Sequence, residues 1–133
     1  DPTAPRTQIG EQDAVQITAL YEKACEGGLG PGCRLAGERL LTGQGAAGKS
    51  DGGARAVKML KRGCESLRDG LSCCGMAQLN QSLAASGTAN GVPAADDGFV
   101  IEARKWATLA SNHGVTCPTA LPPNATNASG GAR

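Results

Sequence analysis

The sequence predicts an all-α fold in which one helix-turn-helix unit occurs about two and a half times. Apolar residues recur at spacings of three and four residues, which is typical of helices that bury one face. Residues 20–25 align with residues 59–64 at an offset of 39, and both segments end in a cysteine. The cysteines that follow, Cys33 and Cys73, are offset by 40 residues. A recurrence of this length indicates a repeat array.

A third unit starts late in the chain, where residues 103–106 match residues 56–59 at an offset of 47. In this alignment Leu20, Met59 and Trp106 occupy the same position in the first helix of each unit. The sequence becomes rich in proline soon after this helix, so we expect no second helix there. Trp106 is expected to pack against the preceding helix pair as part of the core.

The first unit has recognisable boundaries for both of its helices. The first helix is expected over residues 13–25, with Asp13 as its N-cap, and a pair of glycines ends it. Pro31 suits the first turn of the second helix, which we expect over residues 33–42. Residues 1–12 lack periodicity and are expected to form an extended leader.

The second and third units follow after glycine-containing loops. Helices are expected over residues 54–66, 73–85 and 99–112, where apolar residues again recur at helical spacing. His113, which a glycine follows, should end the last of them. Residues 118–133 are rich in Pro, Asn and Gly, and we expect a tail without regular structure.

Several short motifs lie between residues 13 and 117. They are Ala19 to Cys25, Gly32 with Cys33, Leu41 to Gly45, Gly91 to Asp97, and Glu102 to Trp106. Together these motifs resemble the Sel1-like repeat, and the cysteine spacing is similar to that of the cysteine-rich bacterial branch of that family. The resemblance covers residues 13–117, which we take as one repeat domain. It implies an α/α solenoid of the TPR-like kind, whose stacked helix pairs present a concave surface to partners.

Composition bears on the compartment and on the core. Six cysteines in 133 residues favour an oxidising compartment, because cytosolic thiols are normally kept reduced. The chain begins with Asp1 and lacks an initial methionine, as expected of a mature chain whose export signal has been removed. No apolar run approaches the roughly 20 residues that span a bilayer. We therefore expect a periplasmic or extracellular protein without a membrane span.

The cysteines lie where predicted helix ends meet. A helix end and the start of its antiparallel partner lie close together, so a cysteine pair across each turn can bond without long backbone excursions. The remaining two cysteines would join the last helix to the second unit, and a bond between the two adjacent cysteines is the strained alternative. The expected disulfides are Cys25 with Cys33, Cys64 with Cys73, and Cys74 with Cys117.

The sequence offers no recognisable catalytic or metal centre. Its cysteines form no Cys-x-x-Cys pair, and His113 is the only histidine, so neither a zinc site nor any other cofactor is expected. No serine is followed three residues later by lysine, the arrangement of penicillin-recognising enzymes. Some cysteine-rich relatives in the resembled family are linked to β-lactam compounds. A β-lactam-associated hydrolase or small-ligand binder is therefore the alternative to a protein without enzymatic activity.

The charge pattern bears on the kind of partner. A formal net charge of +1 gives little attraction for polyanions, so nucleic acid is not an expected partner. We expect a protein-protein interaction or assembly-scaffold domain, a subunit or adaptor of an envelope complex that binds another protein or peptide. The candidate partner-binding residues are Tyr21, Lys58, Lys61, Arg62 and Trp106.

Overall fold

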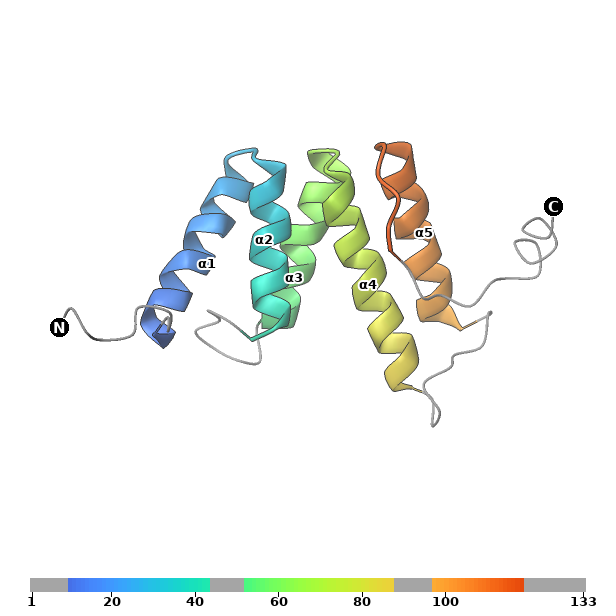
Figure 1. The fold of residues 1–133 in the computed structure, drawn as a ribbon, viewed down its shortest axis with the longest axis horizontal. Helices are drawn as coiled ribbons and strands as arrows, with labels where there is room; N and C mark the ends of the chain where they lie inside the picture. The colour runs from blue at the N-terminus through green and yellow to red at the C-terminus, as the bar shows by residue number, and fades with distance from the viewer. Residues whose placement is uncertain (1–9, 44–51, 88–96, 119–133) are drawn as a thin grey trace.

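The computed structural model describes residues 10–43, 52–87 and 97–118, and this part of the chain consists of helices and turns without any strand. The all-α prediction is confirmed for these residues. Figure 1 shows the helices standing in a row in chain order, with α1 and α5 at its two ends. The helices are α1 (Glu11–Glu26), α2 (Gly30–Leu41), α3 (Gly52–Lys61), the π-helix η2 (Arg62–Ser66), α4 (Gly70–Ser86) and α5 (Gly98–Asn112).

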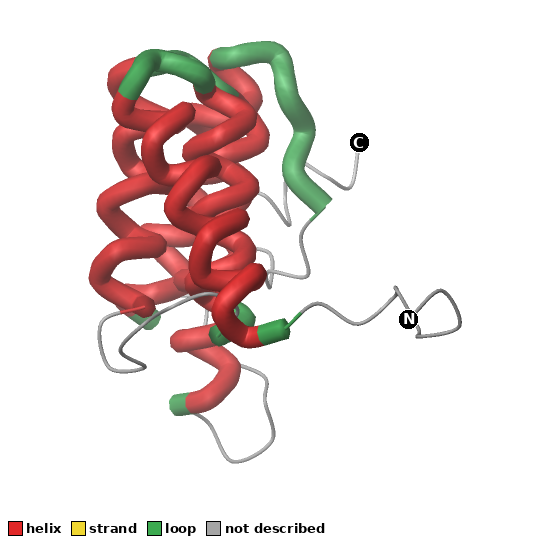
Figure 2. Tube along the Cα trace, turned by 90° about the vertical axis from the view of Figure 1, so that its left-hand side faces the viewer, coloured by secondary structure: helices red, strands yellow, loops and turns green. Residues whose placement is uncertain are grey.

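Neighbouring helices in the row pack against each other. Helix α1 contacts α2, α2 contacts both α3 and α4, and α4 contacts α5. Three connections lie side by side at the same ends of the helices, at the top of Figure 1. They are the α1–α2 turn, the α3–α4 turn and the segment that follows α5. Figure 2 shows the helices from the side, with these turns again at one end.

The interior consists of two hydrophobic clusters, and α3 contributes to both. Met59 belongs to the first cluster and Leu60 to the second. The first cluster contains Cys25, Cys33, Ala36, Leu40, Ala56 and Met59. The second contains Leu60, Cys64, Cys73, Cys74, Met76, Ala77, Trp106, Ala110 and Cys117. Trp106 is only 4% exposed and thus lies in the core, as its repeat position predicts.

Helix α1 begins earlier than the sequence predicts, so the assignment of Asp13 as its N-cap is wrong. Gly10 is the N-cap, and its carbonyl oxygen accepts a hydrogen bond from Ala14 N at 2.9 Å. Asp13 lies exposed in the first turn, where a carboxylate interacts favourably with the positive end of the helix dipole. Part of the expected leader, residues 11–12, is therefore helical; residues 1–9 of that leader and residues 119–133 of the expected tail lie outside the described residues.

The other helices also begin slightly earlier than predicted. Helix α4 begins at Gly70 because Asp69 caps it, accepting a hydrogen bond from Ser72 N at 3.2 Å. Helix α5 begins at Gly98, with Asp97 accepting from Phe99 N at 2.8 Å. Both carboxylates satisfy backbone donors that the first turn of a helix leaves unpaired.

The end of the third predicted helix is a π-helix, η2. Leu67 N donates a hydrogen bond to Arg62 O, five residues earlier, at 3.2 Å. This spacing is that of a π-turn, which contains one more residue than an α-turn. This extra residue accounts for the change of repeat offset from 39 to 40 between the two cysteine pairs. The Cα distance of Cys64–Cys73 consequently stays at 4.7 Å, close to the 4.5 Å of Cys25–Cys33.

Each of the three connections at the top of Figure 1 contains a residue whose backbone lies in the left-handed region, with positive φ. Units one and three use Gly28 and Gly114, with φ of 102° and 85°. The second unit places Arg68 there, with φ of 54°. A residue with a Cβ atom is strained in this region, whereas glycine is not.

Candidate interaction cleft between helices α2 and α4

A cleft of about 330 Å³ opens between the C-terminal part of α2 and the second half of α4. The two helices run in the same direction, and Figure 1 shows α4 leaning away from α2 toward their C-terminal ends. Apolar side chains form the base and part of the walls, and polar side chains form the rim. The lining residues are Glu38, Leu41, Thr42, Leu60, Gly75, Gln78, Leu79 and Ser82.

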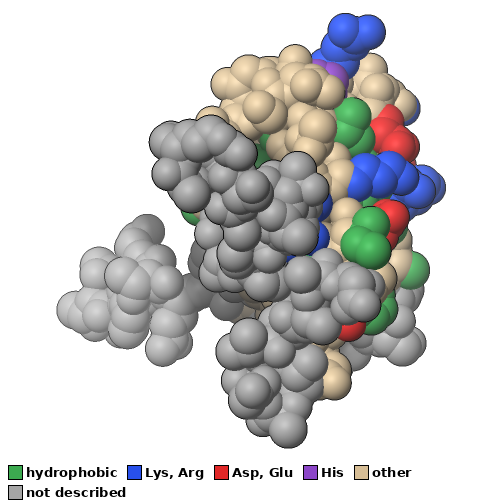
Figure 3. Space-filling model, turned by 90° about the vertical axis from the view of Figure 1, so that its right-hand side faces the viewer, with side chains coloured by type: hydrophobic (Ala, Val, Ile, Leu, Met, Phe, Trp, Pro, Cys, Tyr) green, Lys and Arg blue, Asp and Glu red, His purple; other side chains and the backbone are tan. Residues whose placement is uncertain are grey.

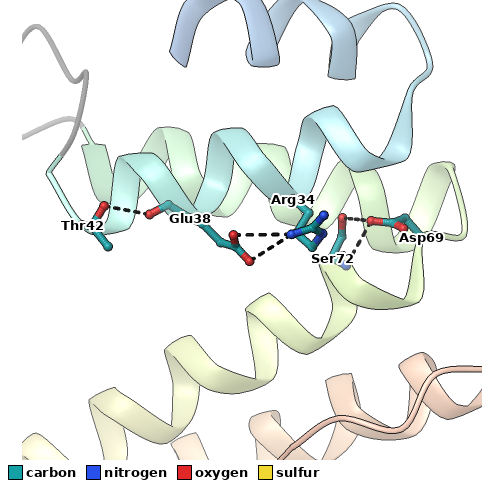
Figure 4. Close-up of polar contacts among 5 residues, drawn as sticks. All are labelled: Arg34, Glu38, Thr42, Asp69 and Ser72. Carbon is teal, nitrogen blue, oxygen red and sulfur yellow. Dashed lines mark hydrogen bonds and ion pairs between the residues drawn. The ribbon is translucent and has the colours of Figure 1, made fainter. Parts of the chain in front are cut away.

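The N-terminal ends of the two helices lie in close contact. Gly30, at the start of α2, lies so close to Asp69 that a Cβ atom on this glycine would be 2.8 Å from the Asp69 Cβ atom. The Asp69 carboxylate also accepts a hydrogen bond from the buried Ser72 hydroxyl at 2.6 Å (Figure 4). This end of the α2–α4 pair is thus closed, and the opposite end forms the cleft.

The base of the cleft is Leu60, which α3 inserts between two glycines. A Cβ atom on Gly37 of α2 would lie 2.5 Å from Leu60 Cγ, and one on Gly75 of α4 would lie 2.7 Å from Leu60 Cδ2. Real side chains do not approach this closely, so the three helices reach this spacing only because residues 37 and 75 lack side chains. Leu60 is fully buried, so the base is well packed.

Glu38 carries the charge at the rim. Its carboxylate lies 3.5 Å from the Arg34 guanidinium one turn earlier on α2, while its backbone carbonyl accepts a hydrogen bond from Thr42 Oγ1 at 3.1 Å (Figure 4). The Glu38 side chain is 52% exposed, and such exposed ion pairs contribute little to stability. Glu38 is the only charged residue among those that line the cleft, and the neighbouring Arg34 balances part of its charge.

The structure does not place the sequence-predicted partner residues in this cleft. Trp106 is buried in the core, so its side chain is not presented at the surface of this structure. Arg62 has a structural role, since its Nε and Nη2 atoms donate to the carbonyl oxygens of Cys25 and Glu26 at 3.0 and 3.1 Å. Tyr21 is half-buried against the first hydrophobic cluster. Of the five, Lys58 and Lys61 are exposed.

The sequence does not by itself predict the cleft, although it contains one signal for it. A glycine inside a helix costs about 1 kcal/mol relative to alanine, so an interior glycine often has a packing reason. Gly37 and Gly75 are such glycines, and each faces Leu60. Both glycines contact the same leucine only because of how α2, α3 and α4 pack together. The sequence alone does not reveal this packing.

The three disulfides join the cysteines that the sequence pairs. Cys25–Cys33 and Cys64–Cys73 close the two turns, and Cys74–Cys117 joins α4 to the segment after α5. The strained bond between the two adjacent cysteines, residues 73 and 74, is absent because each is bonded elsewhere.

His113, the C-cap residue of α5, lies beside the Cys64–Cys73 disulfide. One of its ring nitrogens and the two sulfur atoms lie within 4.8 Å of one another. Both sulfur atoms are engaged in the disulfide, so they provide no thiolate for a metal ion in this oxidised state. The sequence gives no indication of this proximity, because the histidine belongs to a different unit.

Comparisons with known proteins leave the chain without an assigned family. No family model matches it, and neither does any curated protein or solved structure. Among the described helices, none is long and apolar enough to cross a membrane.

Proposed function

We propose that this protein is a non-enzymatic interaction domain that binds a peptide segment of another protein in the α2–α4 cleft. The observation that carries the proposal is the cleft itself, whose apolar base and single carboxylate lie on a framework held by disulfides. A rigid, preformed site lowers the entropy cost of binding.

The chemistry of the lining residues defines the peptide. An apolar side chain would lie between Leu41 and Leu79, above the buried Leu60, because burying it there removes apolar surface from water. A lysine or arginine nearby would face Glu38, whose carboxylate is half-exposed. We therefore propose a ligand that combines a bulky apolar residue with a neighbouring cation.

The proposed role in the cell is a scaffold or adaptor in an envelope complex. The repeated units and the order of the helices support a Sel1-like α/α solenoid, a fold that commonly serves as a binding surface. Three disulfides support a periplasmic or extracellular location, where such bonds persist. Titration of thiols in the denatured, unreduced protein from its native source tests the location, and two or more free thiols would contradict it.

A selection from a random peptide library tests the cleft. We expect the wild-type protein to enrich peptides with an apolar residue next to Lys or Arg. Leu79→Lys should weaken their binding at least tenfold, and Glu38→Lys should shift the selection toward acidic peptides, since the charge opposite the ligand is reversed. Glu65→Lys, which reverses the charge of an exposed residue of η2 outside the cleft, is the matched control and should bind as the wild type does. Equal weakening by the control would contradict the proposal.

A small ligand is the second candidate, because about 330 Å³ lies at the low end of the range for small-molecule pockets. The β-lactam-associated alternative belongs to this class. Turnover of a β-lactam by the purified protein, with loss of activity in Ser82→Ala, would favour a hydrolase over the interaction domain. Failure of β-lactams to bind or react would leave the peptide as the ligand of the cleft.

A further inference from the structure

A second groove, of about 350 Å³, lies on α1, apart from the cleft. Its lining residues are Gln16, Ala19, Leu20 and Lys23, which share one face of the helix by their spacing. Leu20 is 66% exposed, the largest exposure among the large hydrophobic residues of the described chain. Helix α1 stands at the end of the row, where no described helix precedes it (Figure 1).

The repeat shows what normally covers this position. Met59 of α3 and Trp106 of α5 are equivalent to Leu20, but they are only 2% and 4% exposed. Met59 packs in the cluster with Cys33 and Ala36 of α2. Trp106 packs in the cluster with cysteines and alanine of α4. In both cases the second helix of the preceding unit supplies short side chains together with one longer apolar residue, Leu40 of α2 or Met76 of α4.

The polar residues of the groove follow the same correspondence. At the offset of 39 residues, Gln16 corresponds to Arg55 and Lys23 to Arg62. Both arginines bind the preceding unit: Arg55 Nε donates to Glu22 at 3.2 Å, and Arg62 donates to the last carbonyl oxygens of α1. Gln16, Leu20 and Lys23 thus correspond to Arg55 and Met59 of α3 and Arg62 of η2, which contact the hairpin of the first unit.

We propose that the outer face of α1 is a docking site for a helical hairpin of a partner protein. The second helix of that hairpin would cover Leu20 with short side chains at positions i and i+3, as α2 does with Cys33 and Ala36. The carbonyl oxygens at the end of its first helix would accept hydrogen bonds from Lys23, as those of α1 do from Arg62. This site is independent of the cleft between α2 and α4.

The described helices of a second copy of this chain do not meet these requirements. The faces of α2 and α4 that would cover Leu20 are already covered by α3 and α5 of the same molecule. The remaining end of the row, α5, presents charged side chains interspersed with hydrophobic ones on its visible described surface (Figure 3). The partner must therefore bring a hairpin whose second helix has an open face.

A synthetic hairpin of residues 10–43, closed by its Cys25–Cys33 disulfide, serves as the probe because its α2 face lacks α3. Added to the isotope-labelled full chain, it should shift the amide resonances of residues 16–23. Leu20→Asp and Lys23→Ala should each weaken the affinity at least tenfold. Leu83→Ala, which changes another exposed leucine, 41% exposed on α4, is the matched control and should have no effect. Shifts confined to other residues, or equal weakening by the control, would overturn the proposal.

A lengthened chain tests the same contact even if the isolated hairpin fails to fold. It carries an additional copy of residues 10–51 directly before residue 10, so that a hairpin precedes α1 at high effective concentration. In this chain Leu20→Ala should lower Tm by about 10 °C, because the original Leu20 is now buried. In the native chain the same substitution should change Tm by only about 1 °C. An equal change in both chains would show that α1 does not accept a hairpin.

Discussion

Gly37 of α2 faces Leu60 of α3 so closely that a methyl group on residue 37 would lie 2.5 Å from Leu60 Cγ. Gly37→Ala should therefore lower the free energy of unfolding by about 1–2 kcal/mol, since overpacking outweighs the better helix propensity of alanine. Gly53→Ala is the matched control, because nothing lies within 4 Å of a Cβ atom there, and it should be neutral or slightly stabilising. Urea unfolding followed by circular dichroism measures both. Equal stability of the two variants would mean that the helices separate easily.

Arg68 occupies a turn position with φ of 54°, where the other two units have glycine. Arg68→Gly should raise the free energy of unfolding by about 1 kcal/mol, because it removes the strain of a Cβ atom in the left-handed region. Arg68→Ala deletes the same charge but keeps the Cβ atom, so it should bring no such gain. A larger gain in the alanine variant would assign the effect to the charge of the arginine.

Trp106 and Leu20 share a repeat position but differ in exposure, at 4% and 66%. Trp106→Ala should cost about 3–5 kcal/mol of unfolding free energy, as expected for a large buried side chain. Leu20→Ala should cost less than about 0.5 kcal/mol in the native chain. Chemical denaturation of both variants tests this contrast, and a small loss for Trp106→Ala would contradict the core role of the tryptophan.

The Cys74–Cys117 disulfide closes a longer loop than the other two, with a sequence separation of 43 residues. The chain-entropy model assigns it about 4 kcal/mol, against about 2.5 kcal/mol for the separation of 8 between Cys25 and Cys33. The double variant Cys74→Ser, Cys117→Ser should lose amide protection first in residues 98–117. Hydrogen exchange measured by mass spectrometry follows the effect by segment. Uniform loss over all helices would show that this bond does not act as a local staple.

The elements of this fold could be predicted because their signals are local. Glycines, Pro31 and the cysteine spacings indicated where each helix pair turns, and the offsets of 39 and 40 already contained the extra residue of the π-helix. The exact helix starts were missed, since Gly10 replaced Asp13 as the cap of α1.

The surfaces could not be predicted in the same way, because they depend on contacts between units. An alignment gives Leu20 and Trp106 the same position, yet only the neighbouring helix decides which of them is buried. Likewise, the cleft exists because α4 diverges from α2 beyond the contact of Gly30 with Asp69. Arg62, expected on a binding face, is instead engaged by the end of α1.

The adjacent residues Cys73 and Cys74 are bonded in opposite directions along the chain, to Cys64 and to Cys117. When the two ends of the oxidised chain are pulled apart, tension passes from Cys64 through two sulfur bridges to Cys117. Residues 65–72 and 75–116, like residues 26–32 within the Cys25–Cys33 bridge, therefore lie outside the path of the force, and they include all of α5 and nearly all of α4. Under mechanical load, the chain can lengthen only in its other parts until a bridge is reduced.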